Sequence, residues 1–530
     1  MTAVTTPTPP AAPPRVPAWA GGVSGLVAAG VALAAGELFA GLSDAVPSLV
    51  VAVGELIIDY TPGSLVETGI EAAGTNDKPL LLAGIVVLSL VFGAALGQLA
   101  IRHPRVADSG FLAFGALGGW AAARNPFSQA GWSWIAAIVA ALLAIATRRF
   151  LLAVAQLPAE SLAGRASGTT ATPEDPMPGR RAFLTLSATA GVVALGATFL
   201  GRALRASRGV GSIRDEIVLP PPDVTAAPIT GTFDSAHPQL SPFITPDRDF
   251  YRIDTALTLP QVDPADWRLR ITGLVDNPYE LTYDDILAMD LEEHTVTLAC
   301  VSNEVGGRLV GNARWLGVPL TTLLDRAGVR PEGTQIVGVS VDDFDAGFPT
   351  RLAYDGRTAL LAVGMNGKPL PVRHGFPARL VVAGLYGYVS AVKWITEIRL
   401  GTDDHDAYWI PRGWSKLGPI KTQSRIDVPH SGAALSPGRT PIAGVAWAPS
   451  VGIEAVEVRI DDGPWRPCRL GGSPSDDTWV QWLLEWDATP GRHRIAVRAI
   501  DKTGAVQPEE RTRPAPNGAQ GHHSIDVNVT

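Results

Sequence analysis

The chain of 530 residues carries 51 acidic and 43 basic side chains, which gives a net charge of −8 at pH 7. This length predicts two or three domains rather than one core. The acidic balance argues against a surface that binds nucleic acid. The two cysteines exclude a disulfide scaffold, a CxxCH haem-attachment motif and a CxxC iron–sulfur motif.

The N-terminal part has the composition of a membrane domain. Residues 1–20, rich in Pro, Thr and Ala, predict a disordered tail. Residues 21–208 then predict a domain of about five membrane-spanning helices. A sixth span through residues 45–58 is the alternative, but it would place the next arginines on the opposite side. The five apolar stretches are 21–42, 79–101, 111–123, 134–147 and the run that ends at Leu200.

Arginines flank these spans in a consistent way. Arg102 and Arg105 follow one span, and Arg148 and Arg149 close another. Basic loops of membrane proteins stay in the cytoplasm. Five spans therefore place everything after Arg208 outside, which predicts a multi-pass protein of the cell membrane with an extracytoplasmic C-terminal part.

The last span begins with Arg180-Arg181-Ala182-Phe183-Leu184, which resembles a twin-arginine export signal. That pathway moves folded proteins, which suits a domain that must acquire a cofactor before export. The alternative is that the two arginines are ordinary positive charge beside a span.

Haem is not predicted in the membrane part. Of the nine histidines, only His103 precedes residue 200. A haem held between helices by histidines needs two facing imidazoles. Glu37 is the clearest ionisable residue within a span, so transport of protons or ions has little support.

Residues 293–303 combine a strand pattern with a cysteine. Val296, Leu298 and Cys300 alternate onto one face, and a glycine-containing loop follows. Cys300 is therefore predicted where a strand passes into a loop. A thiolate there could serve as a soft metal ligand or as a nucleophile. The alternative is a small buried apolar residue, the usual fate of a free cysteine.

Five blocks in the C-terminal half follow one another at 295–303, 311–320, 365–371, 374–379 and 392–394. In order and approximate spacing they resemble the sulfite oxidase family of molybdenum-cofactor enzymes. The resemblance covers about residues 240–530 and implies a molybdopterin-binding catalytic domain at 241–428, where short strands and helices suit an α+β fold. The prolines at 220–222 mark a linker at 209–240 before it.

The resemblance also implies the site residues. Cys300 would ligate molybdenum, and Arg252, Arg412 and Trp414 would be further catalytic residues. Arginine and lysine suit a phosphate, and an aspartate suits the amino groups of a pterin. Asp254 stands where the family carries a histidine. The cofactor-binding residues that the resemblance implies are Arg252, Asn303, Asp342, His374, Arg379 and Lys393.

Departures from the family near Cys300 bear on the substrate. Val305 stands where sulfite oxidases carry an arginine, and Glu304 precedes it. Trp414 aligns with the family's active-site tyrosine, and Arg412 is a remaining cation. A pocket that loses a guanidinium and gains a carboxylate should bind sulfite poorly, because desolvation of the anion is no longer offset. We therefore predict a small oxygen-donor or oxygen-acceptor substrate other than sulfite, with a redox carrier as partner.

Residues 429–530 predict an all-β domain. Alternating patterns at 455–460, 479–486 and 493–499 indicate strands, and Asp461-Asp462-Gly463 is a hairpin signal. This spacing is typical of an immunoglobulin-like sandwich. It resembles the family's dimerisation domain, which implies a homodimer.

Together these patterns predict a multidomain, membrane-anchored, molybdopterin-dependent oxidoreductase. Its fold combines N-terminal transmembrane α-helices, an α+β molybdenum-cofactor domain of sulfite oxidase type and a C-terminal β-sandwich. The rival hypothesis is a membrane-tethered binding protein on a degenerate cofactor fold. The joint presence of Cys300, Arg252, His374, Arg379 and Lys393 argues against that rival.

Overall fold

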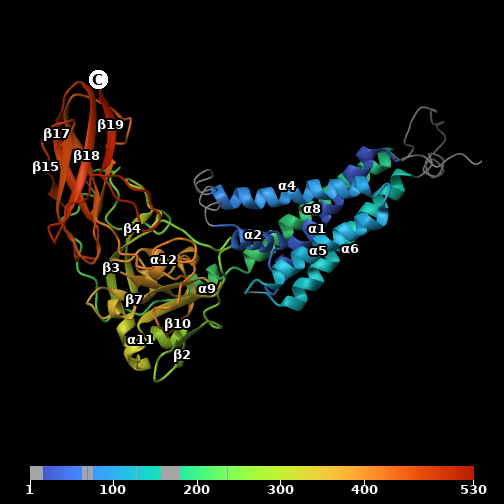
Figure 1. Ribbon diagram of the computed structural model, residues 1–530, viewed down its shortest axis with the longest axis horizontal. Coiled ribbons are helices and arrows are strands. Elements are labelled where there is room, and N and C mark those ends of the chain that lie inside the picture. Colours follow the sequence, from blue (N-terminus) through green and yellow to red (C-terminus); the bar gives the residue numbers. More distant parts are fainter. Residues whose placement is uncertain (1–15, 63–68, 70–75, 127, 157–179, 235–236) are drawn as a thin grey trace, which may run out of the picture. The chain divides into compact units, whose positions relative to one another are not determined.

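The computed structural model describes residues 16–62, 69, 76–126, 128–156, 180–234 and 237–530. The chain divides into two units, Met1–Gly209 and Val210–Thr530. Helices make up the described part of the first unit, and the described strands all lie in the second (Figure 1). Most of the predicted N-terminal tail lies outside the described residues, and α1 already begins at Ala18.

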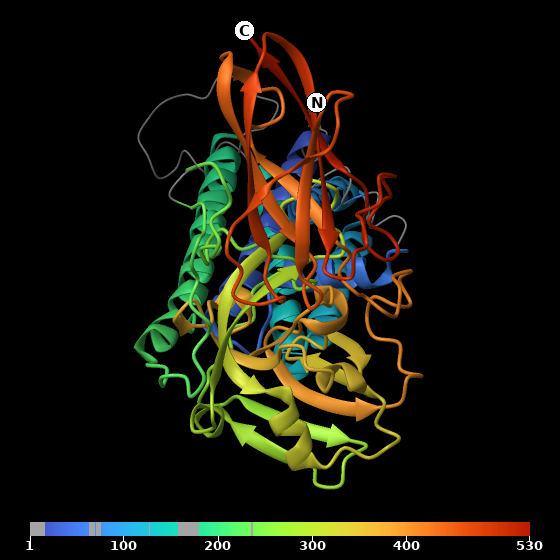
Figure 2. The same cartoon turned by 90° about the vertical axis from the view of Figure 1, so that its left-hand side faces the viewer.

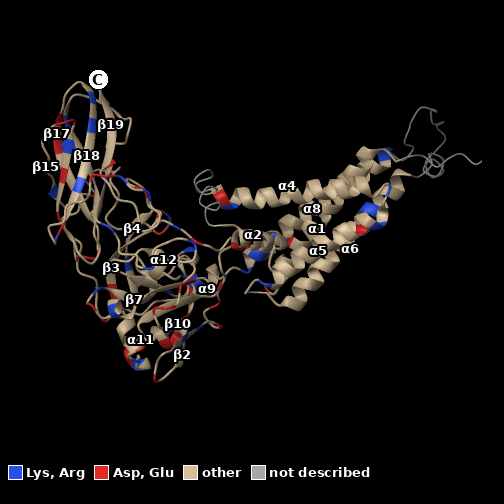
Figure 3. Ribbon diagram, in the orientation of Figure 1, with Lys and Arg blue, Asp and Glu red and all other residues tan. Residues whose placement is uncertain are grey.

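The first unit consists of apolar helices, in which every backbone hydrogen bond can be made within one segment, as lipid requires. Lys, Arg, Asp and Glu are sparse along them (Figure 3). Four described segments are long and apolar enough to cross a membrane: Ala18–Leu42, Asp77–Leu99, Ala130–Ala155 and Arg180–Glu216. The helices are α1 (Ala18–Leu42), α2 (Leu49–Tyr60), α4 (Asp77–Leu99), α5 (Pro104–Ala123), α6 (Ala130–Ala155) and α8 (Arg180–Ser207).

The predicted number of spans is only partly reproduced. Residues 111–123 do form a helix within α5, but α5 also contains Arg105 and Asp108 and is not one of the four apolar segments. Helix α2 has 12 residues, which is too short to cross a bilayer. The described residues thus contain four candidate spans, and the counts of about five or six spans stay predictions.

Glycines allow α1 and α4 to pack closely. A Cβ atom at Gly25 would lie 2.0 Å from the carbonyl oxygen of Gly93 and 2.7 Å from the Cα of Gly97. No side chain fits at such a distance, so this contact requires glycine on both helices. Small residues spaced four apart are a common means of close helix contact in membranes.

A buried ion pair links α5 to α6. Arg148 Nη2 lies 2.5 Å from Asp108 Oδ1, and the Arg148 side chain is 1% exposed. The other carboxylate oxygen of Asp108 pairs with the exposed Arg149. A charge among apolar helices is tolerated when it is paired. Arg148, predicted as a basic residue at the end of a span, thus neutralises the one carboxylate of α5.

Two sheets form the body of the second unit's first part (Figure 1). One has the order β2-β1-β10-β5-β6, in which β1 and β10 are parallel. The other has the order β3-β4-β7-β8, and β9 also pairs with β7. The strands are β1 (Arg268–Gly273), β2 (Tyr279–Thr282), β3 (Glu292–Ala299), β4 (Val310–Pro319), β5 (Gln335–Ser340), β6 (Asp345–Pro349), β7 (Ala359–Met365), β8 (Lys368–Pro369), β9 (Arg379–Val382) and β10 (Ile395–Gly401). The helices are α9 (Gly211–Glu216), α10 (Tyr283–Leu287), α11 (Leu320–Ala327), η2 (Thr350–Ala353), η3 (Val372–His374) and α12 (Gly387–Ser390).

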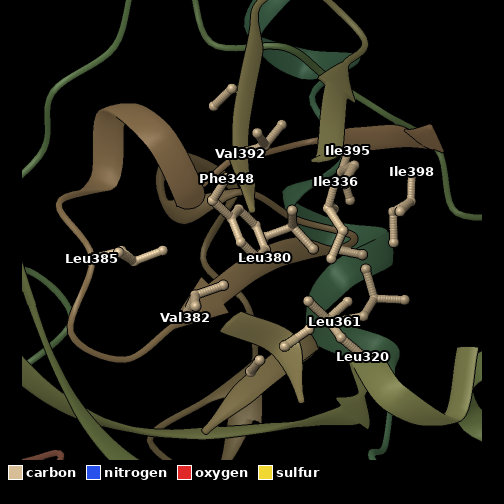
Figure 4. Packing of buried hydrophobic residues seen from close by; sticks show 14 of the residues in the cluster. Leu320, Ile336, Phe348, Leu361, Leu380, Val382, Leu385, Val392, Ile395 and Ile398 are labelled. Atoms are coloured by element: carbon tan, nitrogen blue, oxygen red, sulfur yellow. The ribbon is translucent and has the colours of Figure 1, made fainter. Parts of the chain in front are cut away.

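These sheets and helices enclose one apolar core. Phe348 of β6, Leu361 of β7 and Leu380 of β9 are each at most 1% exposed and lie together in it (Figure 4). Burial of each such side chain stabilises the fold by roughly 1.5–3 kcal/mol. Strand β7 is buried along its whole length. The mixture of short strands and helices agrees with the predicted α+β domain.

The C-terminal part is a sandwich of two sheets, with orders β11-β13-β17-β16 and β12-β19-β18-β14-β15 (Figure 2). Its core includes Trp482 from one sheet and Ile495 from the other. The sandwich begins at Gln423 rather than after Val428, because β11 pairs with β13. Its immunoglobulin-like classification stays a prediction. The strands are β11 (Gln423–Val428), β12 (Ala434–Leu435), β13 (Gly438–Trp447), β14 (Ile453–Ile460), β15 (Arg466–Pro467), β16 (Arg469–Leu470), β17 (Val480–Ala488), β18 (Gly491–Asp501) and β19 (His523–Val529).

The sandwich and the α+β part share a hydrogen-bonded boundary along β3. Thr297 Oγ1 accepts from the backbone N–H of Trp479 at 2.8 Å and donates to Asn312 Oδ1 at 3.0 Å. The indole N–H of Trp479 donates to the carbonyl of Phe243 at 2.9 Å. Strand β3 is consequently buried on both faces from Thr295 onward, whereas its alternation predicted one buried face. The end of the strand is thereby fixed.

Candidate active site

Cys300 follows directly after β3, as the sequence predicts, and its side chain is buried. The Cys300 backbone N–H donates to the carbonyl of Leu309 at 2.9 Å, which closes the loop 301–309. Within the loop, Asn303 donates its backbone N–H to the Cys300 carbonyl at 3.1 Å. The Asn303 side-chain oxygen accepts from the Leu309 N–H at 2.8 Å. Asn303 therefore braces the loop from inside through bonds to both of its ends.

The surroundings of the thiol disfavour a free thiolate. Burial raises the pKa of the Cys300 thiol, although hydrogen bonds with Ser302 and the charge of Lys393 oppose the shift. Burial also raises the pKa of two nearby phenols, Tyr251 and Tyr386, the latter to about 12, and a charge on Cys300 raises both further. Both phenols are thus protonated near neutral pH and can donate hydrogen bonds toward this space. A Cys300 thiolate would need a metal or a cation to offset its charge.

Two predicted cations face each other beside this space. Arg379 at the start of β9 and Lys393 before β10 form an antiparallel bridge. Arg379 donates to the carbonyl of His374 at 3.1 Å and lies 5.0 Å above the ring of Trp315. Burial lowers the pKa of Arg379 to about 10 and that of Lys393 to about 8, and Asp254 opposes both shifts. Both side chains therefore hold a positive charge in a poorly solvated place.

Asp254 joins Arg252 to this pair. The Arg252 Nε atom lies 2.8 Å from Asp254 Oδ2, and the other carboxylate oxygen accepts from Lys393 Nζ. The Asp254 side chain is 3% exposed and that of Arg252 is 33% exposed. Lys393 also donates to the carbonyl of Ile253 at 3.0 Å. The aspartate that stands in place of the family's histidine thus gathers two of the predicted site residues.

His374 is buried and neutral beside the cations. Its Nε2 lies 2.8 Å from the carbonyl oxygen of Asp247 and must carry the proton that this oxygen accepts. Burial lowers the pKa of His374 to about 3, the bond to Asp247 opposes that shift, and Arg379 and Lys393 add to it. Nδ1 is therefore left as an acceptor. The ring also packs edge-on against Phe250 at 5.6 Å.

Asp342 lies in the turn between β5 and β6, and the backbone of this turn is bonded to the segment that follows Lys393. Its neighbour Val341 donates its backbone N–H to the carbonyl of Trp394 at 3.0 Å, and Trp394 follows Lys393. Asp343 has a φ of 63°, the left-handed conformation that aspartate tolerates better than most residues. The turn therefore brings the predicted acidic residue to the Lys393 segment.

Arg412 and Trp414 lie within a group of aromatic residues. Trp414 contacts Tyr388 of α12, with ring centroids 5.8 Å apart, and also Trp409 at 6.4 Å. Arg412 stacks 3.7 Å above the ring of Tyr408 and donates to its carbonyl at 2.6 Å. The guanidinium predicted to supply positive charge is thus engaged within its own segment.

Glu304 and Val305, the two loop residues from which poor binding of sulfite is predicted, differ in solvent exposure. Glu304 is exposed, and Val305 is buried. The backbone oxygen of Val305 accepts from Arg511 of the sandwich at 3.2 Å. A side chain longer than valine at position 305 would have to displace its neighbours, so this position lies in packed surroundings.

Several site residues were not predicted. Tyr251 and Arg373 precede predicted residues directly, so their place in the sequence was an available signal. Tyr386 and Gly387 had no such signal, because they reach the site only through the fold. A Cβ atom at Gly387 would lie 3.8 Å from the Tyr251 hydroxyl oxygen and 4.0 Å from the Ala299 carbonyl.

Buried polar atoms test whether these residues suit a molybdenum–pterin group. Of the buried polar atoms that have no hydrogen-bond partner among the described residues, four belong to this site: Asn303 Nδ2, Asp342 Oδ1, Arg373 Nε and His374 Nδ1. Two are donors and two are acceptors, and each costs about 1–3 kcal/mol if it stays unsatisfied. A ligand with a phosphate and an aminopterin edge offers complementary groups, so the residues fit. Within the described ranges no group of three or more His, Cys, Asp or Glu side chains could hold a metal ion.

Comparison with known proteins agrees with this chemistry. Residues 256–409 match the family described as "Oxidoreductase molybdopterin binding domain". Mitochondrial sulfite oxidase of Rattus norvegicus is 28% identical over 316 residues, which is 50% of this chain and 58% of that protein. The uncharacterised oxidoreductase YuiH of Bacillus subtilis is 33% identical over 159 residues, which is 29% of this chain and 76% of that protein. The crystal structure of the sulfane dehydrogenase SoxCD from Paracoccus pantotrophus is 26% identical, covering 55% of this chain and 84% of that one, with a TM-score of 0.49.

The fold and the site thus define a molybdopterin-binding oxidoreductase domain. The chain belongs to the sulfite oxidase family of molybdopterin-dependent oxidoreductases. It spans 58% of the length of the rat sulfite oxidase that it matches. The match at 256–409 excludes Arg252, Arg412 and Trp414 and includes Cys300, Asn303, Asp342, His374, Arg379 and Lys393.

The position of Lys393 predicts how cofactor retention depends on pH. Because its pKa is lowered to about 8, the ammonium is charged at pH 7 and loses its charge as the pH rises above 8. We expect the protein to retain an anionic pterin about tenfold less tightly at pH 9.5 than at pH 7. The measurement is the fluorescence of pterin released from the purified protein after dialysis at each pH.

Lys393→Met should retain less pterin at pH 7 and should lose this pH dependence. Lys368→Met is the matched control, since Lys368 is exposed on β8, and it should behave as the wild type. A pH dependence that persists unchanged in Lys393→Met would assign it to another group.

Proposed function

We propose that the chain is a membrane-anchored, molybdopterin-dependent oxidoreductase that transfers an oxygen atom to or from a small substrate. The observation that carries the proposal is a buried cysteine at a strand end beside cations and unpartnered polar atoms. When bound, the molybdenum–pterin group supplies two-electron oxygen-atom transfer and exchange of single electrons with a carrier.

The protein's own residues divide the remaining work. Cys300 provides a thiolate ligand, whose charge the metal offsets. Lys393 and Arg379 neutralise the phosphate, for which ammonium and guanidinium groups are suited. The neutral His374 accepts a hydrogen bond through Nδ1, and Asp342 accepts from amino groups of the pterin. Each of these roles matches the charge and the free hydrogen-bonding atom of the residue.

The rival function is binding without catalysis on the same fold. The family's ligand cysteine and its cationic residues are all kept in one place, and the thiol is buried rather than exposed to solvent. A binding protein that had abandoned metal chemistry would have no need of this arrangement. The oxidoreductase therefore has the better support.

Replacement of Cys300 separates the two functions. We expect Cys300→Ser to lose molybdenum and oxidoreductase activity while it keeps the pterin through its phosphate contacts. Metal content is measured by mass spectrometry of purified protein, and pterin content by fluorescence. Cys468→Ser is the matched control, since Cys468 packs in the sandwich, and it should keep all three. Full activity or full molybdenum content in Cys300→Ser contradicts the ligand role.

We propose further that the substrate is not sulfite. Val305 supplies no charge at the position where the relatives carry an arginine, Arg412 is engaged with Tyr408, and Glu304 adds a negative charge. An anionic substrate such as sulfite would therefore meet little positive charge to offset its desolvation, whereas a neutral oxygen donor or acceptor does not depend on such charge. Dimerisation through the sandwich and electron exchange with a separate carrier complete the proposal.

Steady-state kinetics test the substrate class. We expect a low kcat/KM for sulfite in the wild type and an increase of about twofold to tenfold in Glu304→Gln, the effect of removing one partly screened charge. Glu332→Gln is the control, because Glu332 is also exposed but lies before β5, and it should leave the value unchanged. Efficient turnover of sulfite by the wild type would refute this part of the proposal.

The membrane part supports the proposed location. Four apolar segments suffice for anchorage, and Arg180 and Arg181 begin the last of them. We propose that the catalytic unit lies on the outer side and that the arginine pair serves as an export signal. The outer location rests on the predicted five spans together with the positive-inside rule, and the export signal rests on the resemblance of the motif.

Reporter fusions test the location. A reporter after Thr530 should be active outside the cytoplasm, and one after Ser161 should be active inside. Replacement of both Arg180 and Arg181 by lysine keeps the charge and should abolish export of the catalytic unit if the pair is read as a signal. If the double variant is exported normally, the arginine pair serves only as positive charge on the cytoplasmic side of the span. If the reporter after Thr530 is active inside and the one after Ser161 is active outside, the proposed side is wrong.

A further inference from the structure

The loop 301–309 carries Cys300 at its start, and its own hydrogen bonds fix only part of it. Cys300 and Leu309 are joined at the two ends, at 2.9 Å. Inside the loop, Gly307 donates its backbone N–H to the carbonyl of Glu304 at 2.8 Å. The carbonyls of Val305 and Gly307 point out of the loop and are satisfied elsewhere. The loop tip, residues 305–307, thus depends on other segments.

The sandwich holds all three residues of this tip. Arg511 Nη2 donates to the carbonyl of Val305 at 3.2 Å, and Arg425 Nη1 donates to the carbonyl of Gly307 at 2.8 Å. Between them, Gly306 has a φ of 80° and lies against His523, so that a Cβ atom there would be 2.3 Å from the imidazole ring. Three side chains of one domain therefore fix three consecutive residues of the other.

Two of these side chains are themselves held in place. Arg425 is buried, and its Nε donates to Asp427 at 2.6 Å while Nη2 donates to Ser241 Oγ at 2.8 Å. His523 accepts through Nδ1 from the backbone N–H of Ile426 at 3.0 Å. Burial first, and then Arg425 and Arg511, lower the pKa of His523 to about 4. The ring is thus neutral at pH 7 and does not repel the two guanidinium groups.

The sandwich also reaches the other side of the cysteine site. Gly518 has a φ of 95°, and a Cβ atom there would lie 2.5 Å from the hydroxyl of Tyr386. The same hydroxyl accepts from the backbone N–H of Lys421 at 3.4 Å. Tyr386 is one of the phenols that respond to charge on Cys300. The C-terminal domain therefore contacts the surroundings of the thiol at two separate places.

We propose that Arg425, Arg511 and His523 of the sandwich are positioning residues, which hold the loop tip so that Cys300 stays buried at the cofactor site. The inference rests on the proposed function only in that it takes Cys300 as the metal ligand. These contacts limit access of solvent and reagents to the Cys300 thiol whether or not a cofactor is bound. The C-terminal domain would then support the cysteine site, in addition to the dimerisation proposed above.

The two cysteines of the chain allow a sharp test, because one reports on the loop and the other on the sandwich. Full-length protein is produced in a host that cannot make the pterin cofactor and is treated with iodoacetamide. Mass spectrometry then gives separate alkylation rates for Cys300 and Cys468. For Arg511→Met we expect the rate at Cys300 to rise about tenfold, the effect of losing one charge-assisted hydrogen bond on local opening, with no change at Cys468.

Conservative variants and a matched control complete the experiment. Arg511→Lys can still donate to the Val305 carbonyl and should restore a rate close to that of the wild type. Arg425→Lys keeps a charge beside Asp427 but cannot also reach Gly307, so it should raise the Cys300 rate alone. Arg439→Met removes an arginine that pairs with Glu485 at 3.3 Å on the exposed face of the sandwich, and it should change neither rate.

An unchanged Cys300 rate in Arg511→Met overturns the proposal. Equal increases at Cys300 and Cys468 overturn it as well, since they would show general loosening of the sandwich rather than release of the loop. The result is independent of the proposed function. Wild-type protein that takes up no molybdenum in a competent host would refute that function and leave the alkylation result in force.

Discussion

The buried carboxylate of Asp254 between Arg252 and Lys393 is the interaction on which the site depends. Without it, three cations would face one another, since Arg379 lies beside Lys393 and Asp254 is the carboxylate whose charge acts on both. Charges removed from water are costly unless they are paired. One carboxylate cannot neutralise three cations, so the cluster keeps an excess of positive charge. That excess suits a phosphate, and it adds to burial, the larger cause, in lowering the pKa of His374.

The fold brings the parts of this cluster together from distant segments. Arg252 and Asp254 precede β1, Arg379 begins β9 and Lys393 precedes β10. Strands β9 and β10 belong to different sheets, so the cluster lies where the two sheets meet. The apolar core beneath them fixes both sheets, and Trp315 of β4 supports the guanidinium of Arg379. Packing of apolar residues thus determines where the charges stand.

Local patterns were sufficient to predict some of this arrangement. The strand that ends at Cys300, the apolar helices and the alternating strands of the sandwich each depend on residues close in sequence, and the structure has them. The ion pair of Asp254 could not be predicted, because its partner Lys393 is distant in the chain. The same holds for Asp108 and Arg148, whose pairing explains why α5 carries a charge among apolar helices. The role of Tyr386 and the burial of Val305 also arise only from contacts between distant segments.

The boundary along β3 has a consequence for the order of events during synthesis. The strand that presents Cys300 is held by Thr297 and Trp479, and the loop after it by Arg511 and His523. A ribosome releases the apolar N-terminal helices long before it reaches these last residues. The helices are therefore complete while the cysteine site is still unfinished. Synthesis of the helices and completion of the site are separated in time by the length of the second unit, so any cofactor that needs the finished site can enter only after Arg511 and His523 have been made.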